Sequence, residues 1–342
     1  MIPVKKEGIL LRKTALSFES EGVLNPAVIK DNGKIHLFYR AVAKNNLSSI
    51  GYCMLSDYKT IETRLSSPVI IPESEYEKQG VEDPRIVKID HLFYLTYTSY
   101  DGINAVGALA TSSDLKSWEK RGIIVPKIPY EKFKVLSEAE GLIPEKYKRY
   151  NEFQVSHTDS GPVFLWNKNL IFFPRKINGK FYFLYRIKPD IQIVSVENIE
   201  DLNAEFWDDY FFHFKNHIVL SPKYDHESSY IGGGCPPIET EYGWLMIYHG
   251  VHDTVNGYIY SACVALLDIK NPGKEISRLP YPLFKPEEEW ELKGEVNNVC
   301  FPTGAIVEND KLYIYYGAAD ERIAVASLSI SKLLKELMIY SV

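Results

Sequence analysis

Two neighbouring carboxylates stand at the start of an apolar, strand-like run in the stretch GVEDPRIVK, residues 80–88. They are Glu82 and Asp83, and Arg85 follows after one proline. Residues two apart face the same side of a strand, so Arg85 can hold the carboxylate of Asp83 or bind a sugar hydroxyl. Glu82 then faces the other way, toward ion pairs with a neighbouring element. A carboxyl group surrounded by donors suits a polyhydroxylated substrate, in which an acid must protonate a leaving oxygen.

Five segments of the chain share the form of this stretch. Each has a proline, a short strand, a polar turn, and a strand of aromatic and aliphatic residues that ends near a tyrosine. The turns include DNGK and INGK, which are of the kind that closes a β-hairpin. The segments are NPAVIKDNGKIHLFYRA from Asn25, EDPRIVKIDHLFYLTYTSYDG from Glu82, FPRKINGKFYFLYRI from Phe173, PPIETEYGWLMIYHGV from Pro236 and FPTGAIVENDKLYIYYGAAD from Phe301.

The spacing of these repeats indicates the fold. Each repeat leaves room for further strands, as in the four-stranded blades of a β-propeller, and five repeats account for the whole chain. We therefore expect an all-β, five-bladed β-propeller that forms a single domain over residues 1–342. A charged, tyrosine-rich insertion at residues 127–157 lengthens the interval between the second and third repeats. We expect it to be partly helical and able to cover a site as a lid. The segment SLSISKLLKEL, residues 327–337, is the best helix candidate, although the end of a propeller chain commonly supplies a closing strand.

A ring of five blades would bring the polar residues near the repeated prolines together at one end of the central axis. Single members of this set can be explained more simply, because Asp-Pro and Asn-Pro form turns and an Asp-x-Arg pair can be a local salt bridge. Several charges gathered in one cleft, however, usually serve a ligand. The set comprises Asn25, Glu82, Asp83, Arg85, Lys168, Asn169, Arg175 and Asp320, with Arg40, Arg186 and His249 at the ends of the hairpins.

The composition argues against several classes of function. A formal net charge of -6 without a basic run offers no nucleic-acid surface. No run of about 18 apolar residues and no leader is evident, so we expect no membrane segment and a cytoplasmic location. The 8 histidines are scattered, GGGC at 232–235 lacks a following helix, and so neither a metal site nor a dinucleotide site is expected. We expect buried free thiols at the widely spaced Cys53, Cys235, Cys263 and Cys300.

Several motifs resemble those of known carbohydrate enzymes. SSDLKSWE, residues 112–119, resembles the Ser-x-Asp-Leu-x-x-Trp signature of five-bladed propeller glycosidases, which marks fold rather than chemistry. VEDPRI, KNLIFFPRKINGKFYFLYR, GGGCPPIETEYGWLMIYHGV and CFPTGAIVENDKLYIYYGAAD together resemble glycoside hydrolase family 130, the β-mannoside phosphorylases and related β-mannosidases. The likeness covers about residues 20 to 325.

This resemblance implies an inverting enzyme that acts on small β-mannosides with no metal or organic cofactor. Asp83 matches the general acid, which is expected to deliver its proton to the glycosidic oxygen through a substrate hydroxyl. Asn25, Arg40 and Asp320 match sugar-binding positions. The positions that gather inorganic phosphate in the phosphorylases are matched by Lys168, Asn169, Arg186 and His249.

One position departs from the phosphorylase pattern. Phosphorylases typically carry a lysine before IGGG, whereas this chain has Tyr230, with Glu227 three residues upstream. A missing lysine and a nearby carboxylate disfavour phosphate, and a glutamate there could instead activate water. We therefore expect hydrolysis of β-mannosidic linkages, with a β-1,2 linkage as one possibility, Asp83 as acid and Glu227 as base.

Three alternatives stay open. Phosphorolysis would use inorganic phosphate as co-substrate and give mannose 1-phosphate, as the retained Lys168, Arg186 and His249 favour. Glu227 could be a solvated loop residue, because SPKYDHESSY is polar throughout. The protein could also be a carbohydrate-binding propeller without catalysis, since one fold hosts many functions. The sequence leaves homo-oligomerisation open.

Overall fold

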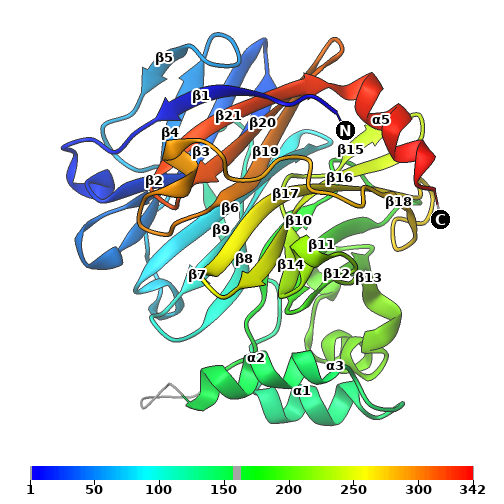
Figure 1. The fold of residues 1–342 in the computed structure, drawn as a ribbon. Coiled ribbons are helices and arrows are strands. Elements are labelled where there is room, and N and C mark those ends of the chain that lie inside the picture. The colour runs from blue at the N-terminus through cyan, green and yellow to red at the C-terminus, as the bar shows by residue number, and fades with distance from the viewer. Residues whose placement is uncertain (1, 157–162, 342) are drawn as a thin grey trace.

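The computed structural model describes residues 2–156 and 163–341, and most of its regular structure is β-sheet (Figure 1). Within these residues, the strands form four sheets, of which one has eight strands and joins two antiparallel units through a single parallel pair, Ser48 with Gly80. We therefore describe the strands as five antiparallel units, numbered along the chain. Unit 1 consists of β2 (Gly22–Asp31), β3 (Lys34–Val42), β4 (Ser48–Leu55) and β5 (Ile61–Arg64). Unit 2 consists of β6 (Gly80–Ile89), β7 (Leu92–Tyr100), β8 (Ala105–Ser112) and β9 (Glu119–Ile123). Unit 3 consists of β10 (Lys168–Phe172), β11 (Phe181–Ile187), β12 (Asp190–Val196) and β13 (Ile218–Leu220).

Units 4 and 5 contain the remaining strands, and unit 5 includes the first and the last strand of the chain. Unit 4 consists of β14 (Tyr230–Gly233), β16 (Gly243–Thr254), β17 (Gly257–Leu267) and β18 (Glu275–Arg278), and the short β15 (Ile238–Thr240) also pairs with β16. Unit 5 consists of β19 (Cys300–Glu308), β20 (Lys311–Ala318), β21 (Arg322–Ser329) and the N-terminal β1 (Lys5–Leu11). Because β1 pairs with β21, the start and the end of the chain meet in one sheet (Figure 1).

Helices and short 3-10 turns connect and flank the sheets. The α-helices are α1 (Tyr130–Ser137), α2 (Glu145–Ser156), α3 (Ala204–Phe212), α4 (Glu289–Leu292) and α5 (Ile330–Ile339). The 3-10 turns are η1 (Ser17–Glu19), η2 (Lys44–Asn46), η3 (Glu75–Glu77), η4 (Ile199–Asp201), η5 (Phe214–His217) and η6 (Asp225–Glu227). Helices α1, α2 and α3 lie together beside unit 3 (Figure 1). Within the described part of the chain, no helix is long and apolar enough to span a membrane.

Among the residues that the structure describes, the hydrophobic core consists of five clusters, each lying between two units. One cluster joins units 1 and 2, and the next joins units 2 and 3 together with α1 and α3. Further clusters join units 3 and 4, units 4 and 5, and units 5 and 1. Each unit therefore buries apolar side chains against both of its neighbours. The first strands also meet, because β2 contacts β6 and β19, and β10 contacts β6 and β14.

The structure confirms much of the predicted architecture. The fold is all-β, and each of the five sequence repeats forms part of a different unit. The insertion is helical, since it contains α1 and α2, although residue 157 at its end lies outside the described residues. The C-terminal segment begins as β21 and continues as α5, and the N-terminal β1 pairs with β21. All four cysteines are buried free thiols, as predicted.

Candidate active site

A polar pocket lies where the first strands of the units meet. Its volume is about 220 Å³, and we call it the axial pocket. Residues that the sequence singled out supply most of its wall, but several aromatic residues and Lys188 belong to it as well. The pocket is lined by Asn25, Arg40, Asp83, Trp166, Lys168, Asn169, Arg186, Lys188, Tyr230, Tyr260, Val299, Phe301 and Asp320.

A repeated β-bulge directs side chains from three first strands into this pocket. At each bulge one residue adopts a left-handed backbone conformation, which Asn and Asp tolerate better than most other residues. These residues are Asn25 (φ 51°) in β2, Asp83 (φ 50°) in β6 and Asn169 (φ 55°) in β10. The extra residue interrupts the alternation of the strand. Three equivalent positions in three units therefore line one pocket.

Two glycines allow these side chains to sit closely against neighbouring strands. A Cβ on Gly317 would lie 2.1 Å from Asn25 Oδ1, and a Cβ on Gly232 would lie 2.5 Å from the His249 ring and 2.7 Å from Asn169 Oδ1. Each of these distances is too short for a carbon atom, so a larger residue at either glycine would displace a polar group of the site. The glycine-rich GGGC stretch thus has a packing role here.

Asp83 is surrounded by donors and positive charges. Asn25 Nδ2 donates a hydrogen bond to Asp83 Oδ1 over 2.7 Å, and Arg40 Nη1 lies 3.7 Å from the same oxygen. Burial raises the pKa of the Asp83 carboxyl, but the surrounding positive charges, first of all Arg40, bring it below its ordinary value. Asp83 is therefore ionised at neutral pH in the free protein, and it must gain a proton before it can act as an acid.

Asp320 supplies a second carboxyl group with the opposite shift. Burial and then repulsion from Asp83 raise the pKa of Asp320 to about 6, although Arg40 offsets part of the effect. The pocket thus holds two carboxyl groups whose pKa values are driven apart by their surroundings. Such a pair is typical of sites that perform acid–base chemistry.

Glu82 joins three units through ion pairs, as the sequence predicted for a side chain facing away from Asp83. Arg40 Nη2 of unit 1 lies 2.8 Å from Glu82 Oε1, and Lys168 Nζ of unit 3 lies 3.6 Å from Glu82 Oε2. Glu82 itself is buried. It fixes two cations beside the pocket without pointing into it.

A second part of the pocket wall is cationic. Arg186 Nη1 lies 3.4 Å from Nε2 of His249, which sits behind the wall against the ring of Phe301. Burial and then the charge of Arg186 hold the pKa of His249 well below its ordinary value, so this imidazole is neutral. In the described part of the chain, neither Arg186 nor Lys188 has a carboxylate within ion-pair distance, in contrast to Lys168. Buried atoms of the site without a described hydrogen-bond partner include Asn25 Oδ1, Asn169 Oδ1, Arg186 Nε and His249 Nδ1.

Aromatic side chains complete the wall, and the sequence reasoning named only Tyr230 among them. Trp166 lies under the ammonium group of Lys168, with 5.0 Å between the nitrogen and the ring centroid. The hydroxyl groups of Tyr230 and Tyr260 are hydrogen-bonded over 2.7 Å. Trp166 and Tyr260 fall outside the repeated motifs, so their place in the pocket depends on the path of the chain between repeats.

Arg85 is close to the site but does not hold the Asp83 carboxylate as predicted. The bulge falls between Glu82 and Arg85, so the rule that residues two apart share a face fails here. The Arg85 side chain is buried and donates to the backbone carbonyls of Asp83 and Gly234. Its role in this structure is to fasten the bulge of β6 to unit 4. Arg175, also grouped with the site by its position, instead pairs with Glu239 over 2.6 Å at the surface.

Glu227 does not line the axial pocket. Its side chain is fully buried in η6, where Tyr248 donates to Oε1, and Arg278 Nη1 lies 3.2 Å from Oε2. The amide of Lys223 also donates to Oε2 over 2.8 Å. A carboxylate with these donors on both oxygens has no access to a substrate or to a water beside one. The expectation that Glu227 activates water is therefore wrong for this structure, and so is the alternative of a solvated loop residue.

The same arrangement recurs in other units, which explains why this glutamate is present. Tyr39 donates to Glu19 over 2.7 Å, Tyr97 donates to Glu77 over 2.7 Å, and Tyr316 donates to Glu291 over 2.5 Å. Each of these glutamates is fully buried and pairs with a cation: Arg64 for Glu19, Lys120 for Glu77 and Lys6 for Glu291. The sequence signal was available, because Glu19, Glu77 and Glu227 each stand three residues before a first strand.

One group of residues has the types and spacing of metal ligands, namely His226, Glu227 and Cys263, whose ligand atoms lie within 4.8 Å of one another. The carboxylate already pairs with Arg278, so a metal ion there would lie beside a guanidinium group. Burial also raises the pKa of the Cys263 thiol well above its ordinary value, which disfavours the thiolate that binds metals. The arrangement fits a structural network better than a metal site.

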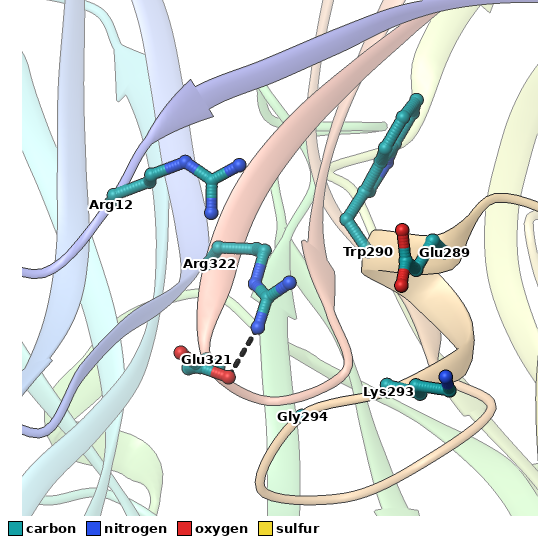
Figure 2. Close-up of a pocket in the computed structure, with 7 residues that line it drawn as sticks. All are labelled: Arg12, Glu289, Trp290, Lys293, Gly294, Glu321 and Arg322. Carbon is teal, nitrogen blue, oxygen red and sulfur yellow. Dashed lines mark hydrogen bonds and ion pairs between the residues drawn. The ribbon is translucent and has the colours of Figure 1, made fainter.

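Two further cavities continue outward from the axial pocket. The first, which we call the outer cavity, has a volume of about 960 Å³ and shares Arg40 and Asp320 with the axial pocket. It also includes η2 and the loop at Glu295. The second has about 370 Å³ and shares Gly294 and Glu321 with the outer cavity. Figure 2 shows this second cavity, with Arg12, Glu321 and Arg322 on one side, Glu289, Trp290 and Lys293 on the other, and an ion pair between Glu321 and Arg322.

Comparison with known proteins identifies the family. The model of glycoside hydrolase family 130, described as beta-1,4-mannooligosaccharide phosphorylase, matches residues 18–338. The chain is 36% identical to a beta-1,2-mannobiose phosphorylase of Thermoanaerobacter sp. (strain X514), with 92% of each chain covered. It is 34% identical to a 1,2-beta-oligomannan phosphorylase of the same organism, covering 96% of this chain and 98% of the relative.

A solved structure shares the fold. The beta-1,2-mannobiose phosphorylase from Listeria innocua, in complex with beta-1,2-mannobiose, superposes with a TM-score of 0.74 at 23% identity, covering 99% of this chain and 100% of the other. These findings confirm the resemblance read from the sequence motifs. The chain belongs to glycoside hydrolase family 130, a family of glycoside-processing enzymes.

Proposed function

We propose that this protein is a phosphorylase that cleaves β-mannosides with inorganic phosphate and releases mannose 1-phosphate. The observation that carries the proposal is the pairing of an acidic and a cationic region in one pocket: Asp83 with its donors, and Arg186 and Lys188 without a described carboxylate partner. A dianion can neutralise those two charges, whereas water cannot. The burial of Glu227 removes the base that hydrolysis would need at that position.

The proposed reaction follows from inversion. A phosphate oxygen attacks the anomeric carbon from the face opposite the leaving sugar and forms the new C–O bond. Asp83, which is ionised in the free protein, first takes up a proton, and in the overall balance the hydrogen phosphate co-substrate supplies it. The bond to the glycosidic oxygen then breaks, and that oxygen receives the proton from Asp83 through a substrate hydroxyl. The product from a β-mannoside is then the α-anomer of mannose 1-phosphate. Phosphate itself is the nucleophile, so no protein carboxylate is required to activate water.

In this proposal the other residues of the pocket bind the two substrates. Asn25, Arg40 and Asp320 bind the mannosyl residue beside Asp83. The phosphate is held by Lys168, Asn169 and Arg186, with His249 behind Arg186. Asn169 Oδ1 and Arg186 Nε, which have no hydrogen-bond partner among the described residues, are then available to the bound substrates.

We further propose that the five units are the blades of a closed propeller and that the substrate is a β-1,2-linked oligosaccharide. The cyclic order of the core clusters, with units 5 and 1 sharing one, supports ring closure. The names of the two Thermoanaerobacter relatives support the β-1,2 linkage, although the family model's description names a β-1,4 linkage. The outer cavity beside Asp320 offers space for further sugar units.

The test is to incubate the purified protein with β-1,2- and β-1,4-mannobiose, each with and without phosphate. Mannose 1-phosphate that forms only when phosphate is present would support the proposal, with faster turnover of the β-1,2 substrate. Free mannose as the sole product, at a rate independent of phosphate, would establish hydrolysis instead. Binding without any turnover would indicate a carbohydrate-binding protein.

A further inference from the structure

Lys188 stands at the turn between β11 and β12 and reaches the axial pocket from there. Its ammonium nitrogen lies 3.9 Å from the ring centroid of Tyr230 and 5.2 Å from that of Tyr150 in α2. Arg186, on the same hairpin, lies 5.2 Å from the ring of Tyr230. The face of one tyrosine therefore supports two cations at the wall of one small pocket.

The electrostatic surroundings of Lys188 are unfavourable in the absence of an anion. Burial, followed by repulsion from Arg186 and Lys168, holds its pKa well below the ordinary value. In the described part of the chain no carboxylate lies within ion-pair distance of its ammonium group. A lysine that only stabilised the fold would be expected to have such a partner or to extend into solvent.

Tyr230 is held in a fixed position beside Lys188. Its hydroxyl is hydrogen-bonded to Tyr260, and its ring packs edge-on against Tyr150 at a centroid distance of 5.9 Å. The hydroxyl of Tyr150 donates in turn to the Ser229 carbonyl over 2.8 Å, so α2 supports the same wall. Tyr230 replaces the lysine that phosphorylases typically carry at this position, but its ring supports Lys188 from the β11–β12 turn of the neighbouring unit.

We propose that Lys188 is a phosphate-binding residue of the axial pocket and that Tyr230 is the positioning residue that holds its ammonium group there. This inference rests on the proposed phosphorolysis and adds to it the residue that supplies a positive charge near position 230. Phosphate would fill the space beside Arg186 and Lys188, and its charge would relieve the repulsion between them. The mannosyl side of the pocket, at Asp83 and Asn25, is not altered by the assignment.

The experiment measures the two substrates separately in Lys188→Met and Lys188→Arg. Loss of one charge-assisted contact predicts a KM for phosphate about tenfold to a hundredfold higher in Lys188→Met, with the KM for β-1,2-mannobiose at saturating phosphate changed less than about twofold. Lys188→Arg retains the charge and is expected to recover most of the phosphate affinity. Lys335→Met, which removes an exposed lysine of α5 outside the pocket, is the matched control and should behave as wild type.

The positioning role is tested at Tyr230. Tyr230→Phe keeps the ring and is expected to leave the KM for phosphate within about threefold of wild type. Tyr230→Leu removes the ring and is expected to raise that KM in the same direction as Lys188→Met. If Tyr230→Leu leaves it unchanged, the positioning role is overturned.

A binding measurement without turnover completes the test. Inorganic phosphate should raise the melting temperature of the wild type and of Lys335→Met, and much less that of Lys188→Met. If the wild type forms mannose 1-phosphate but Lys188→Met keeps the wild-type KM and the phosphate shift, the assignment of Lys188 is overturned and the proposed function stands. If the wild type releases only free mannose regardless of phosphate, both proposals are overturned.

Discussion

The amide group of Asn25 donates a hydrogen bond of 2.7 Å to the carboxylate of Asp83, and so links the same bulge position of two adjacent units. The repeat that builds the sheets thus also builds the site. Each of these bulge residues occupies the same position in its repeat and places a polar side chain in the wall of the axial pocket. The chemistry of the pocket differs from unit to unit because the residue in the bulge differs, while the backbone conformation is shared.

Asp83→Asn is expected to abolish turnover while the protein remains folded. The amide is close in size to the carboxylate and can keep one contact to Asn25, but it cannot supply a proton to the substrate. We expect kcat/KM for β-1,2-mannobiose to fall by at least about a thousandfold. The measurement is steady-state kinetics, together with a melting curve for each variant.

Asp225→Asn is a suitable control for that substitution. Asp225 is an exposed residue of η6 that does not line the axial pocket, so the same chemical change should leave kcat/KM unchanged. Turnover of Asp83→Asn near the wild-type rate would remove Asp83 from the proposed mechanism.

Glu227→Gln is expected to reduce stability rather than catalysis. The substitution removes one of the two carboxylates that pair with the buried Arg278, which keeps its pair with Glu275, so we expect a loss of about 1 to 3 kcal/mol in the free energy of unfolding. Urea unfolding at neutral pH would measure the loss, and kcat of the folded fraction should stay within about threefold of wild type. Glu77→Gln breaks the corresponding contact to Lys120 in unit 2 and should behave in the same way. If Glu227→Gln has normal stability but loses turnover, and Glu77→Gln does not, Glu227 must instead take part in the mechanism.

Asp83 and Glu227 illustrate which parts of the fold and of the site could be predicted from the sequence. The repeats and the hairpin turns were sufficient to predict an all-β fold of five units, because alternation and turn chemistry are local properties of the chain. Equivalent positions in the repeats also predicted that Asn25, Asp83 and Asn169 would meet. The place of Glu227 was missed because its role was predicted from its position just before IGGG and from the polar residues around it in the sequence, whereas its partners Tyr248 and Arg278 lie on later strands.

Other parts of the site depended on features that the sequence does not display. The bulge that separates Arg85 from the Asp83 carboxylate is a break in register, and alternation alone cannot predict it. Lys188 and Tyr230 meet only because β11 and β14 belong to neighbouring units. A comparison of the repeats with one another would have exposed the glutamate at a fixed distance before three first strands, but not these contacts between units.

Because of the outer cavity, we expect the KM for the oligosaccharide to depend on the number of sugar units in it. Lys44 and Asn46 of η2 line this cavity but not the axial pocket. Replacing both by alanine removes donors that can reach sugar hydroxyls beyond the cleaved bond. We expect the KM for β-1,2-linked trisaccharides and longer chains to rise about threefold to tenfold, while the KM for mannobiose stays unchanged. Equal effects on all chain lengths would show that the outer cavity does not bind the extended substrate.

Asp320 is expected to control the pH dependence of the pocket. After burial, the negative charge of Asp83 raises the pKa of Asp320 to about 6, whereas the pKa of Asp83 itself is lowered. Asp83 is therefore already ionised in the pH range in which Asp320 changes charge. Asp320→Asn removes that ionisation, so the change in kcat/KM for β-1,2-mannobiose that we expect near pH 6 in the wild type should be absent from the variant, even if the substitution also weakens sugar binding. A change of the same size near pH 6 in Asp320→Asn would contradict the assignment of this titration to Asp320.

The same carboxyl group gives a prediction for stability that does not depend on activity. The folded protein favours the protonated form of Asp320, because its pKa rises from an ordinary 3.8 to about 6 on folding. The stabilising contribution is fully present below pH 3.8 and is lost as the pH rises through about 6, because the unfolded chain releases this proton first. Residue 320 cannot ionise in Asp320→Asn. The free energy of unfolding of this variant minus that of the wild type, measured by urea titration across this range, should therefore increase as the pH rises. If the difference between the two proteins is constant from pH 4 to pH 7, the raised pKa of Asp320 is wrong, and with it the account of two carboxyl groups driven apart by one pocket.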